Sequence, residues 1–328
     1  MSERLWRTQV LESTNADQMR RLFVDVFGSE MPQALWEWKY GYGRGRALVA
    51  YDAQGRMVGH YGGIRRVVSM FGHNETAVQI SDVMVAQDVR GVLTRSGPFA
   101  MLTSAFLDSY IGAGKEYLVG FGFPSHRHLR IAQRLNMYAQ VDTVVELHWP
   151  IAVQTSQLPW WQRIEVLDFA DSRAMTILDG LWQAQRDSSG NWIVPQRDAA
   201  WWRFRLHDHP THSYRCLLLR NRWTGRALGA VALRPGSIAG EAWELMDWIG
   251  PVSYVPCLLQ AARYAAYEGG ATHLQGWFSS SVATLLHTPD CSRHDIGVQV
   301  PTSIRGPGPA PDVLQGRWWL TSADTDFR

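Results

Sequence analysis

Between residues 14 and 27, apolar side chains recur every three or four positions, and Gly28 follows the last of them. This spacing predicts an amphipathic helix. The helix should end at Gly28, because glycine readily takes the left-handed conformation that closes a helix. A second, short helix is expected from Pro32 to about Tyr40, since proline is favoured in the first helical turn.

The rest of the first half alternates between strand and helix patterns. Residues 47–51 and 57–64 are rich in apolar and β-branched side chains and flank a turn with Gly55, which predicts a hairpin. The other elements expected in this half are strands at 76–85, 117–122 and 138–149 and helices at 98–111 and 126–135. This order is typical of an α/β fold in which helices flank a mixed sheet.

The second half repeats the order after a polar, proline-flanked stretch at 150–159. The elements expected there are strands near 164–168, 243–249, 273–278 and 318–321, helices at 172–185 and 254–268, and a hairpin at 214–233. Three short sequences also recur in the same order, 35–40 at 199–204, 55–59 at 225–229, and 114–120 at 270–276. Recurrence at matching places indicates an internal repeat. We therefore expect two tandem domains, residues 1–150 and 151–328, each a twisted mixed β-sheet flanked by helices.

Length and charge agree with this organisation. At 328 residues the chain exceeds the usual size of one small core. Its formal net charge of +2 gives no strong field, so we expect neither a nucleic acid nor a membrane as partner, and a small molecule fits better. Cys216, Cys257 and Cys291 are too few and too scattered for a disulfide scaffold. Without an apolar leader or a membrane-spanning run, a cytoplasmic location is expected, and the oligomeric state stays open.

Tryptophan distinguishes the two halves. Of 16 tryptophans, only Trp6, Trp36 and Trp38 precede residue 149. Large aromatic side chains fill cores and also line ligand clefts, and composition does not separate these uses.

Strand 76–85 leads through a loop with arginine and glycine into helix 98–111. The loop contains Arg90-Gly91 and then Arg95-Ser-Gly-Pro-Phe. Backbone N–H groups and the dipole of a helix N-terminus attract phosphate, and glycine lets the main chain approach it. These motifs resemble the pyrophosphate site of the GNAT acyl-CoA-dependent acyltransferases, in particular bacterial members with two copies of the fold, and the resemblance spans nearly the whole chain. The loop is longer here than in the family.

The resemblance implies a donor site for acetyl-CoA or another acyl-CoA, threaded between two strands that splay apart. The residues that it places there are Met84, Val85, Arg90, Gly91, Arg95, Ser96, Gly97 and Pro98. A strand amide near Met84 or Val85 would stabilise the tetrahedral oxyanion. A plain surface loop is the alternative.

Two titratable residues fall near the implied reaction centre. A tyrosine on the family's next helix often protonates the departing thiolate, and His128 takes its place here; a solvated histidine is the alternative. Asp82 lies on the strand that meets the acyl carbonyl, where a carboxylate can take a proton from the amine directly or through water. It can equally hold the adjacent loop.

The resemblance also implies an acceptor cleft. Trp36, Trp38 and Tyr40 lie in the helix that borders it, His60 lies on the hairpin strand that faces it, and Phe123 lies in the rim 120–124. Aromatic side chains there can stack on a sugar, an amine or an acyl chain, or can simply pack in the core.

The implied reaction is N-acyl transfer to a primary amine of a small metabolite, amino sugar or amino acid by direct attack. The acyl group is acetyl or a longer chain, and the sequence leaves its length open. The alternative is an inactive GNAT-fold module that binds a sugar or a partner protein. We expect no metal, because His207, His209 and His212 with Asp208 lack a further ligand. The second copy has no Arg-Gly loop after 246–250, so it is expected to close the acceptor side of the cleft.

Overall fold

The computed structural model describes residues 6–90, 97–153, 156–236 and 240–325. The chain divides into two compact units. Unit 1 comprises Met1–Val67, Glu75–Val141 and Gln299–Gln315, and unit 2 comprises Val68–Asn74, Asp142–Val298 and Gly316–Arg328. Two mixed sheets with flanking helices confirm the predicted α/β fold and are consistent with two tandem domains.

The first sheet has the strand order β1-β2-β3-β4-β5. Its strands are β1 (Arg7–Val10), β2 (Gly45–Tyr51), β3 (Met57–Met70), β4 (His73–Val85) and β5 (Val119–Phe121). The helices of this part are α1 (Ala16–Phe27), α2 (Gln33–Tyr40), α3 (Pro98–Tyr110) and α4 (His126–Arg134), with the short α9 (Pro311–Leu314) later in the chain. Gly28 ends α1 in the left-handed conformation, as predicted.

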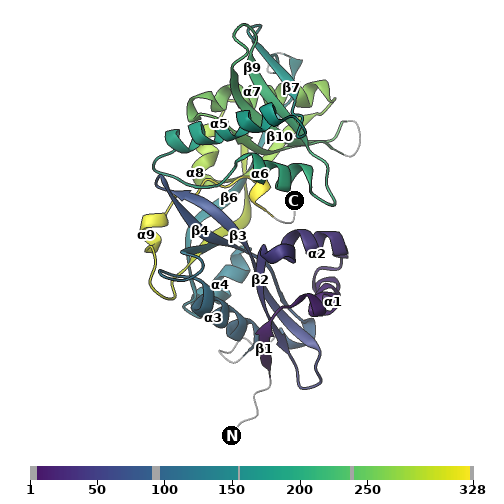
Figure 1. The fold of residues 1–328 in the computed structure, drawn as a ribbon, viewed down its shortest axis with the longest axis vertical. Helices are drawn as coiled ribbons and strands as arrows, with labels where there is room; N and C mark the ends of the chain where they lie inside the picture. Colours follow the sequence, from purple (N-terminus) through teal and green to yellow (C-terminus); the bar gives the residue numbers. More distant parts are fainter. Residues whose placement is uncertain (1–5, 91–96, 154–155, 237–239, 326–328) are drawn as a thin grey trace. The chain divides into compact units, whose positions relative to one another are not determined.

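Helices cover both faces of this sheet. In Figure 1, α1 and α2 lie on one side of it, and α3 and α4 lie on the other. A Cβ atom at Gly59 would lie 2.8 Å from Leu102, and one at Gly63 would lie 3.2 Å from Phe106. The glycines of β3 therefore let α3 pack directly on the strand.

The parallel strands β4 and β5 pair only over a short length. Their register runs from Ala77↔Val119 to Gln79↔Phe121. Beyond Gln79, β4 continues to Val85, whereas the chain after β5 leads into α4. The strands thus part at the carboxyl end of the sheet, where ligands of open α/β sheets usually bind.

The second sheet has the order β13-β6-β12-β11-β10-β9-β7. Its strands are β6 (Tyr138–Pro150), β7 (Gln162–Val166), β9 (Arg215–Asn221), β10 (Ala227–Arg234), β11 (Trp243–Ile249), β12 (His273–Ser279) and β13 (Ser292–Ser303). Its helices are α5 (Ser172–Ser188), α6 (Ala199–Trp202), α7 (Val255–Glu268) and α8 (Ser280–Ala283). The short strand β8 (Ile193–Pro195) pairs with the end of β3.

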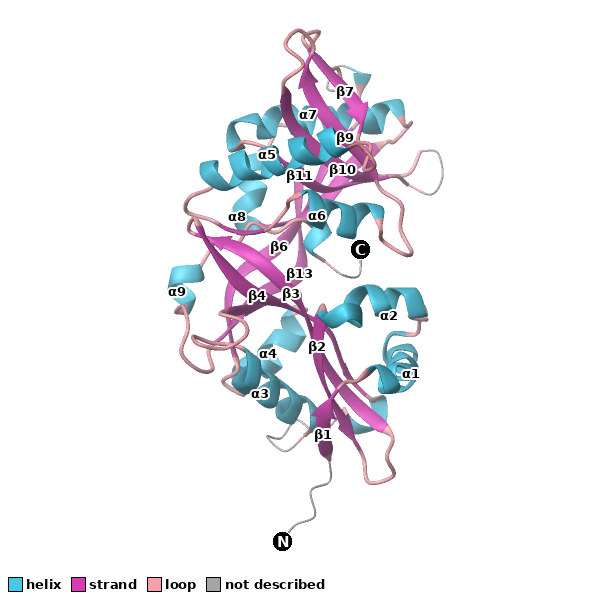
Figure 2. Cartoon of the chain, viewed as in Figure 1, coloured by secondary structure: helices cyan, strands magenta, loops and turns pink. Residues whose placement is uncertain are grey.

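Both faces of the second sheet are also covered. The neighbouring residues Leu217 and Leu218 of β9 belong to different core clusters, the first with residues of α7 and the second with residues of α5. Because successive strand residues point to opposite faces, α7 and α5 cover opposite sides of these strands (Figure 2).

The units exchange strands, which the sequence did not indicate. Residues 144–150 of β6 pair with β12, so the strand expected to end the first domain joins the second sheet. Conversely, the end of β13 belongs to unit 1, where the N–H of Gln299 donates to the carbonyl of Pro124. The units consequently divide between Val141 and Asp142, and not at the expected boundary of 150–159.

The recurring sequences occupy corresponding turns. Gly55 and Gly225 both have positive φ, 78° and 69°, in the turns that join β2 to β3 and β9 to β10. Gly114 and Gly270, with φ of 79° and 76°, precede β5 and β12, each of which pairs in parallel with the strand before it.

The predictions for the end of the chain were less accurate. The strand expected at 318–321 is replaced by two isolated bridges, Ile193↔Trp318 and Phe278↔Thr321. The long strand β13 was not predicted, because its first residues are exposed and polar. Among the described residues, no helix combines the length and the apolar character that crossing a membrane requires.

Candidate active site

The site is built around Asp82, whose backbone departs from strand geometry within β4. Its φ is 50°, in the left-handed region that residues other than glycine rarely adopt. A residue held there costs about 1–3 kcal/mol and persists only where its surroundings impose the conformation. The contacts that hold Asp82 come from α2 and β3.

Helix α2 supplies the partners of the Asp82 carboxylate. The Nζ atom of Lys39 lies 2.8 Å from Oδ1 and 2.9 Å from Oδ2, and the hydroxyl of Tyr40 donates to Oδ2 at 2.7 Å. Only 3% of the Lys39 side chain and 6% of the Asp82 side chain are exposed. Enclosed charges are tolerated when they are paired and hydrogen-bonded in this way.

This pairing determines the protonation of Asp82. Burial by itself raises the pKa of the carboxyl, but the charge of Lys39 and the hydrogen bonds from Lys39 and Tyr40 outweigh burial, and the pKa lies below its ordinary value. A carboxylate stabilised to this degree is a weak base. The geometry therefore favours the holding role for Asp82 over direct proton abstraction.

His60 on β3 is fully buried beside Asp82. Its Nδ1 lies 2.6 Å from the main-chain oxygen of Asp82, and a carbonyl oxygen only accepts, so Nδ1 carries the proton. The lone pair is then on Nε2, which has no hydrogen-bond partner among the residues that the structure describes. Burial lowers the pKa of His60; Asp82 opposes this and Lys39 adds to it, so the ring is neutral near pH 7.

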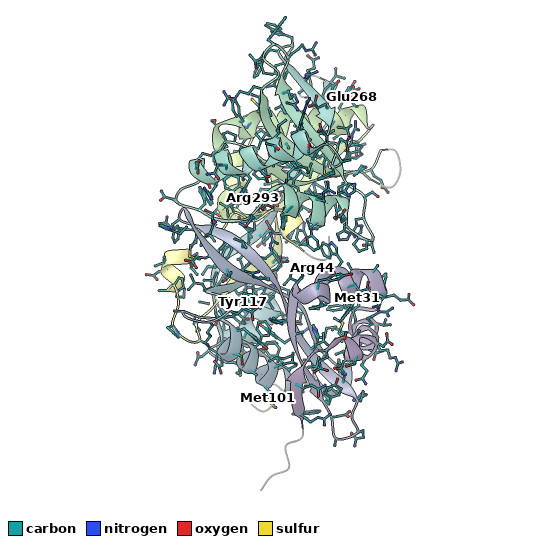
Figure 3. All side chains as sticks on the ribbon, viewed as in Figure 1. Met31, Arg44, Met101, Tyr117, Glu268 and Arg293 are labelled. Atoms are coloured by element: carbon teal, nitrogen blue, oxygen red, sulfur yellow. The ribbon has the colours of Figure 1, made fainter. Side chains whose placement is uncertain are left out.

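Residues that flank α2, together with its two tryptophans, fix the helix in place. Met31 and Arg44 lie at its two ends (Figure 3). Arg44 donates to the carbonyls of Trp38, at 2.9 Å, and Glu37, at 2.8 Å, which satisfies acceptors in the last turn. Trp36 belongs to the core cluster of unit 1. Trp38 is buried as well, and neither indole presents an open stacking surface.

The end of β4 and the start of α3 carry the features expected of a phosphate site. The Nε atom of Arg90 donates to the carbonyl of Val85 at 2.8 Å, which fixes the guanidinium just beyond the strand. Gly97 is the N-cap of α3, and Pro98 is its first residue. The positive end of the helix dipole therefore lies at this point. Three predicted contacts, Gly91, Arg95 and Ser96, fall outside the described residues.

His128 lies in the first turn of α4. Ser125 caps the helix by accepting the N–H of His128, and its Oγ lies 3.1 Å from Nδ1 of the same residue. Partial burial, followed by the charges of Arg127 and Arg90, lowers the pKa of His128 from its ordinary value of 6.5. Arg90 is thus near enough to His128 to oppose protonation of its ring. The imidazole is largely neutral near pH 7, which disfavours it as a proton donor there.

The last two predicted residues are Met84, which lies in the core, and Phe123, which lies nearer the surface. Met84 is buried in the core of unit 1. Phe123, just after β5, is partly exposed and stacks edge-on against Phe121 at 6.2 Å between ring centroids.

One family model covers the part of the chain that carries these features. They are the parting of β4 and β5, Arg90 beyond β4, and the start of α3. Residues 7–136 match the family model of the acetyltransferase (GNAT) domain. The matched segment is therefore a GNAT-type domain. None of the curated proteins compared with the chain matches it.

Solved structures share the GNAT fold across both units. A probable N-acyltransferase of unknown function from Enterococcus faecalis V583 is 14% identical, with a TM-score of 0.69, over 90% of this chain and 71% of its own. A GCN5-related N-acetyltransferase from Anabaena variabilis is 13% identical, with a TM-score of 0.65, over 90% and 72%. One from Kribbella flavida is 15% identical, with a TM-score of 0.61, over 91% and 71%. At these identities the likeness concerns the fold.

The histidine-rich segment of the second unit engages its own neighbours. Nδ1 of His207 lies 2.7 Å from Asp208, and Nδ1 of His209 accepts the N–H groups of Thr211 and His212. Within the described ranges, no group of three or more His, Cys, Asp or Glu residues is arranged to hold a metal ion.

Sequence reasoning missed Lys39, the buried cation that pairs with Asp82. A signal was available, because Lys39 stands between the aromatic residues Trp38 and Tyr40 in the second half of this helix. A lysine in such a position requires an anionic partner.

Proposed function

We propose that the protein is an acyl-CoA-dependent N-acyltransferase, with acetyl-CoA as the simplest donor, that acts in the cytoplasm. Its acceptor would be a primary amine of a small metabolite, amino sugar or amino acid. The observation that carries this proposal is the opening between β4 and β5 beside the start of α3, within the matched GNAT domain.

The donor end would be held by charge and by the helix. The dipole of α3 and the guanidinium of Arg90 favour a pyrophosphate at the end of β4. In the reaction the amine nitrogen attacks the thioester carbonyl carbon, the C–N bond forms, and the C–S bond breaks. A main-chain N–H near Met84 or Val85 would stabilise the oxyanion.

The proton of the amine needs an acceptor, and His60 suits this role better than Asp82. Nε2 of His60 carries a lone pair without a described partner, whereas the Asp82 carboxylate already accepts hydrogen bonds from Lys39 and Tyr40. Asp82 would orient His60 through its main-chain oxygen, in a positioning role. The thiolate would take its proton from water or from His128, and the products would be the amide and free CoA.

The experiment is thiol release with a panel of primary amines that contains amino acids, amino sugars and polyamines. We expect free thiol to form only when protein, acetyl-CoA and an accepted amine are all present, with an amide product of the matching mass. A reaction without amine corrects for hydrolysis and for the three cysteines of the chain. If acetyl-CoA binds but no amine in any class is acylated, the catalytic proposal fails and the binding-module alternative gains support.

A further inference from the structure

Strand β7 forms one end of the second sheet. It pairs with β9 in antiparallel register from Gln162↔Asn221 to Val166↔Leu217, and within the described chain no strand pairs with its other edge (Figure 1). An open edge presents unpaired N–H and C=O groups and is a template for another strand.

The hydrogen bonds to β9 show which main-chain groups face the open edge. The carbonyl of Trp161 accepts from Arg222, and the N–H of Leu167 donates to Cys216. In an antiparallel pair, residues bonded to one neighbour alternate with residues directed the other way. The odd-numbered residues therefore face β9, and the main-chain groups of Ile164 face outward at the middle of the strand.

The charges of β7 are arranged symmetrically about Ile164. Arg163 and Glu165 lie on one face, with 3.7 Å between their charged atoms. If a second β7 pairs in antiparallel register centred on Ile164, Arg163 of each copy lies directly opposite Glu165 of the other. Opposite charges at such positions stabilise a pair of strands, whereas like charges directly opposite each other destabilise it.

Exposed apolar side chains accompany this edge. Val166 at the end of β7 is 69% exposed. Trp160, just before β7, and Trp223, in the turn between β9 and β10, are 72% and 70% exposed, and their rings meet edge to face at 5.7 Å. Large aromatic residues in such positions are enriched at protein interfaces.

We propose that β7 is the interface between two copies of this chain, joined by antiparallel pairing centred on Ile164. The two second sheets then form one continuous sheet. This inference is independent of the catalytic proposal, because it concerns only residues of unit 2 at the edge opposite β13.

The test uses charge reversal and mixing of the full-length protein, followed by analytical ultracentrifugation. Arg163→Glu places acidic side chains opposite each other in a homodimer, and Glu165→Arg places basic ones opposite each other. We expect each variant to dissociate at least about tenfold more readily than the wild type. Mixing the two variants restores both opposite-charge pairs, so a heterodimer should form. Arg173→Glu, an exposed arginine on α5, is the control and should leave the dimer intact.

A further variant covers the case in which a charge reversal disturbs folding, which thermal melting would reveal. Ile164→Pro removes an N–H that faces the open edge and leaves the bonds to β9 in place, and it should abolish the dimer. A wild-type protein that is monomeric throughout the micromolar range would overturn the proposal. A dimer that withstands all three β7 substitutions, or folded single variants that do not associate on mixing, would overturn it as well.

Discussion

Each unit contains a buried aspartate in its sheet, on β4 in unit 1 and on β11 in unit 2, and each aspartate pairs with a cation from outside the sheet. Asp82 forms an ion pair with Lys39. Both carboxylate oxygens of Asp247 accept a hydrogen bond from Nε of Arg197, each at 3.0 Å. Arg197 also reaches Asp324, and no part of the Arg197 or Asp247 side chains is exposed.

The two pairs differ in how completely the surrounding polar groups are satisfied. Around Asp247, the hydroxyl of Thr321 and the carbonyl of Pro195 complete the network. Around Asp82, the backbone is in the left-handed region, and the neighbouring His60 keeps Nε2 without a described partner. A closed buried network is typical of a structural role, and an incompletely satisfied one is typical of a functional site.

The pKa values of the two aspartates move in opposite directions, because burial prevails at Asp247 and ion pairing prevails at Asp82. Burial raises the pKa of Asp247 to about 6, with repulsion from Asp324 adding to it and Arg197 opposing it, whereas Lys39 and Tyr40 overcome burial at Asp82. After β11 the chain passes through Gly250 and Pro251 towards α7, without an Arg-Gly loop. The comparison supports a catalytic unit 1 and a structural unit 2.

The largest effect is expected from breaking the closed network. Arg197→Met leaves two buried carboxylates without their cation and should lower the free energy of unfolding by about 3–5 kcal/mol. Denaturant unfolding measures this, and Arg226→Met, at an exposed position of the same unit, is the control. A loss below about 1 kcal/mol would mean that the network does not stabilise unit 2.

The next largest effect is expected at His60 in unit 1. His60→Asn retains a donor near the Asp82 carbonyl but removes the Nε2 lone pair, so kcat should fall about 100-fold with unchanged acetyl-CoA affinity. In the wild type, activity should decline as pH falls through the lowered pKa of His60, below 6.5, because the protonated ring cannot accept a proton. Steady-state kinetics across pH measure both, with exposed His73→Asn as the control. Full activity in His60→Asn would return the base role to another group.

Loss of the cation at the end of β4 should have a smaller effect. Arg90→Ala should weaken acetyl-CoA binding about tenfold, because it removes one exposed charge from the proposed pyrophosphate site. Calorimetry measures the affinity, and Arg21→Ala on the exposed side of α1 is the matched control. Equal affinity in both variants would remove Arg90 from the donor site.

The smallest effect is expected at the second predicted catalytic residue. Because the pKa of His128 is lowered, the ring is mostly neutral at pH 8, and His128→Ala should reduce kcat by less than about tenfold there. The difference should grow as pH falls and the wild-type ring becomes protonated. A loss of 100-fold or more at pH 8, roughly the size of a full general-acid contribution, would contradict this account.

Local patterns in the sequence predicted what local physics decides. The spacing of α1, its stop at Gly28, and the turns at Gly55 and Gly225 follow from helix period and glycine conformation. The exchange of β6 into the second sheet depends on pairing with the distant β12, which periodicity does not encode.

The candidate site was likewise predicted only where local sequence patterns determine it. The helix that carries Trp36 and Tyr40 was predicted, but the conformation of Asp82 is imposed by Lys39 and His60, which lie far from it in sequence. The resemblance placed Asp82 and His60 in one region. Only the three-dimensional contacts distinguish Asp82, whose carboxylate is paired, from His60, whose Nε2 has no partner among the described residues.

The central claim is that unit 1 alone forms an acyl-CoA site. Calorimetric titration of the full chain with acetyl-CoA, and separately with free CoA, tests it most directly. The account predicts one site per chain with micromolar affinity, weakened in Arg90→Ala and unchanged in Arg197→Met at temperatures where that variant is folded. Two equivalent sites per chain, or no binding of either ligand, would contradict it.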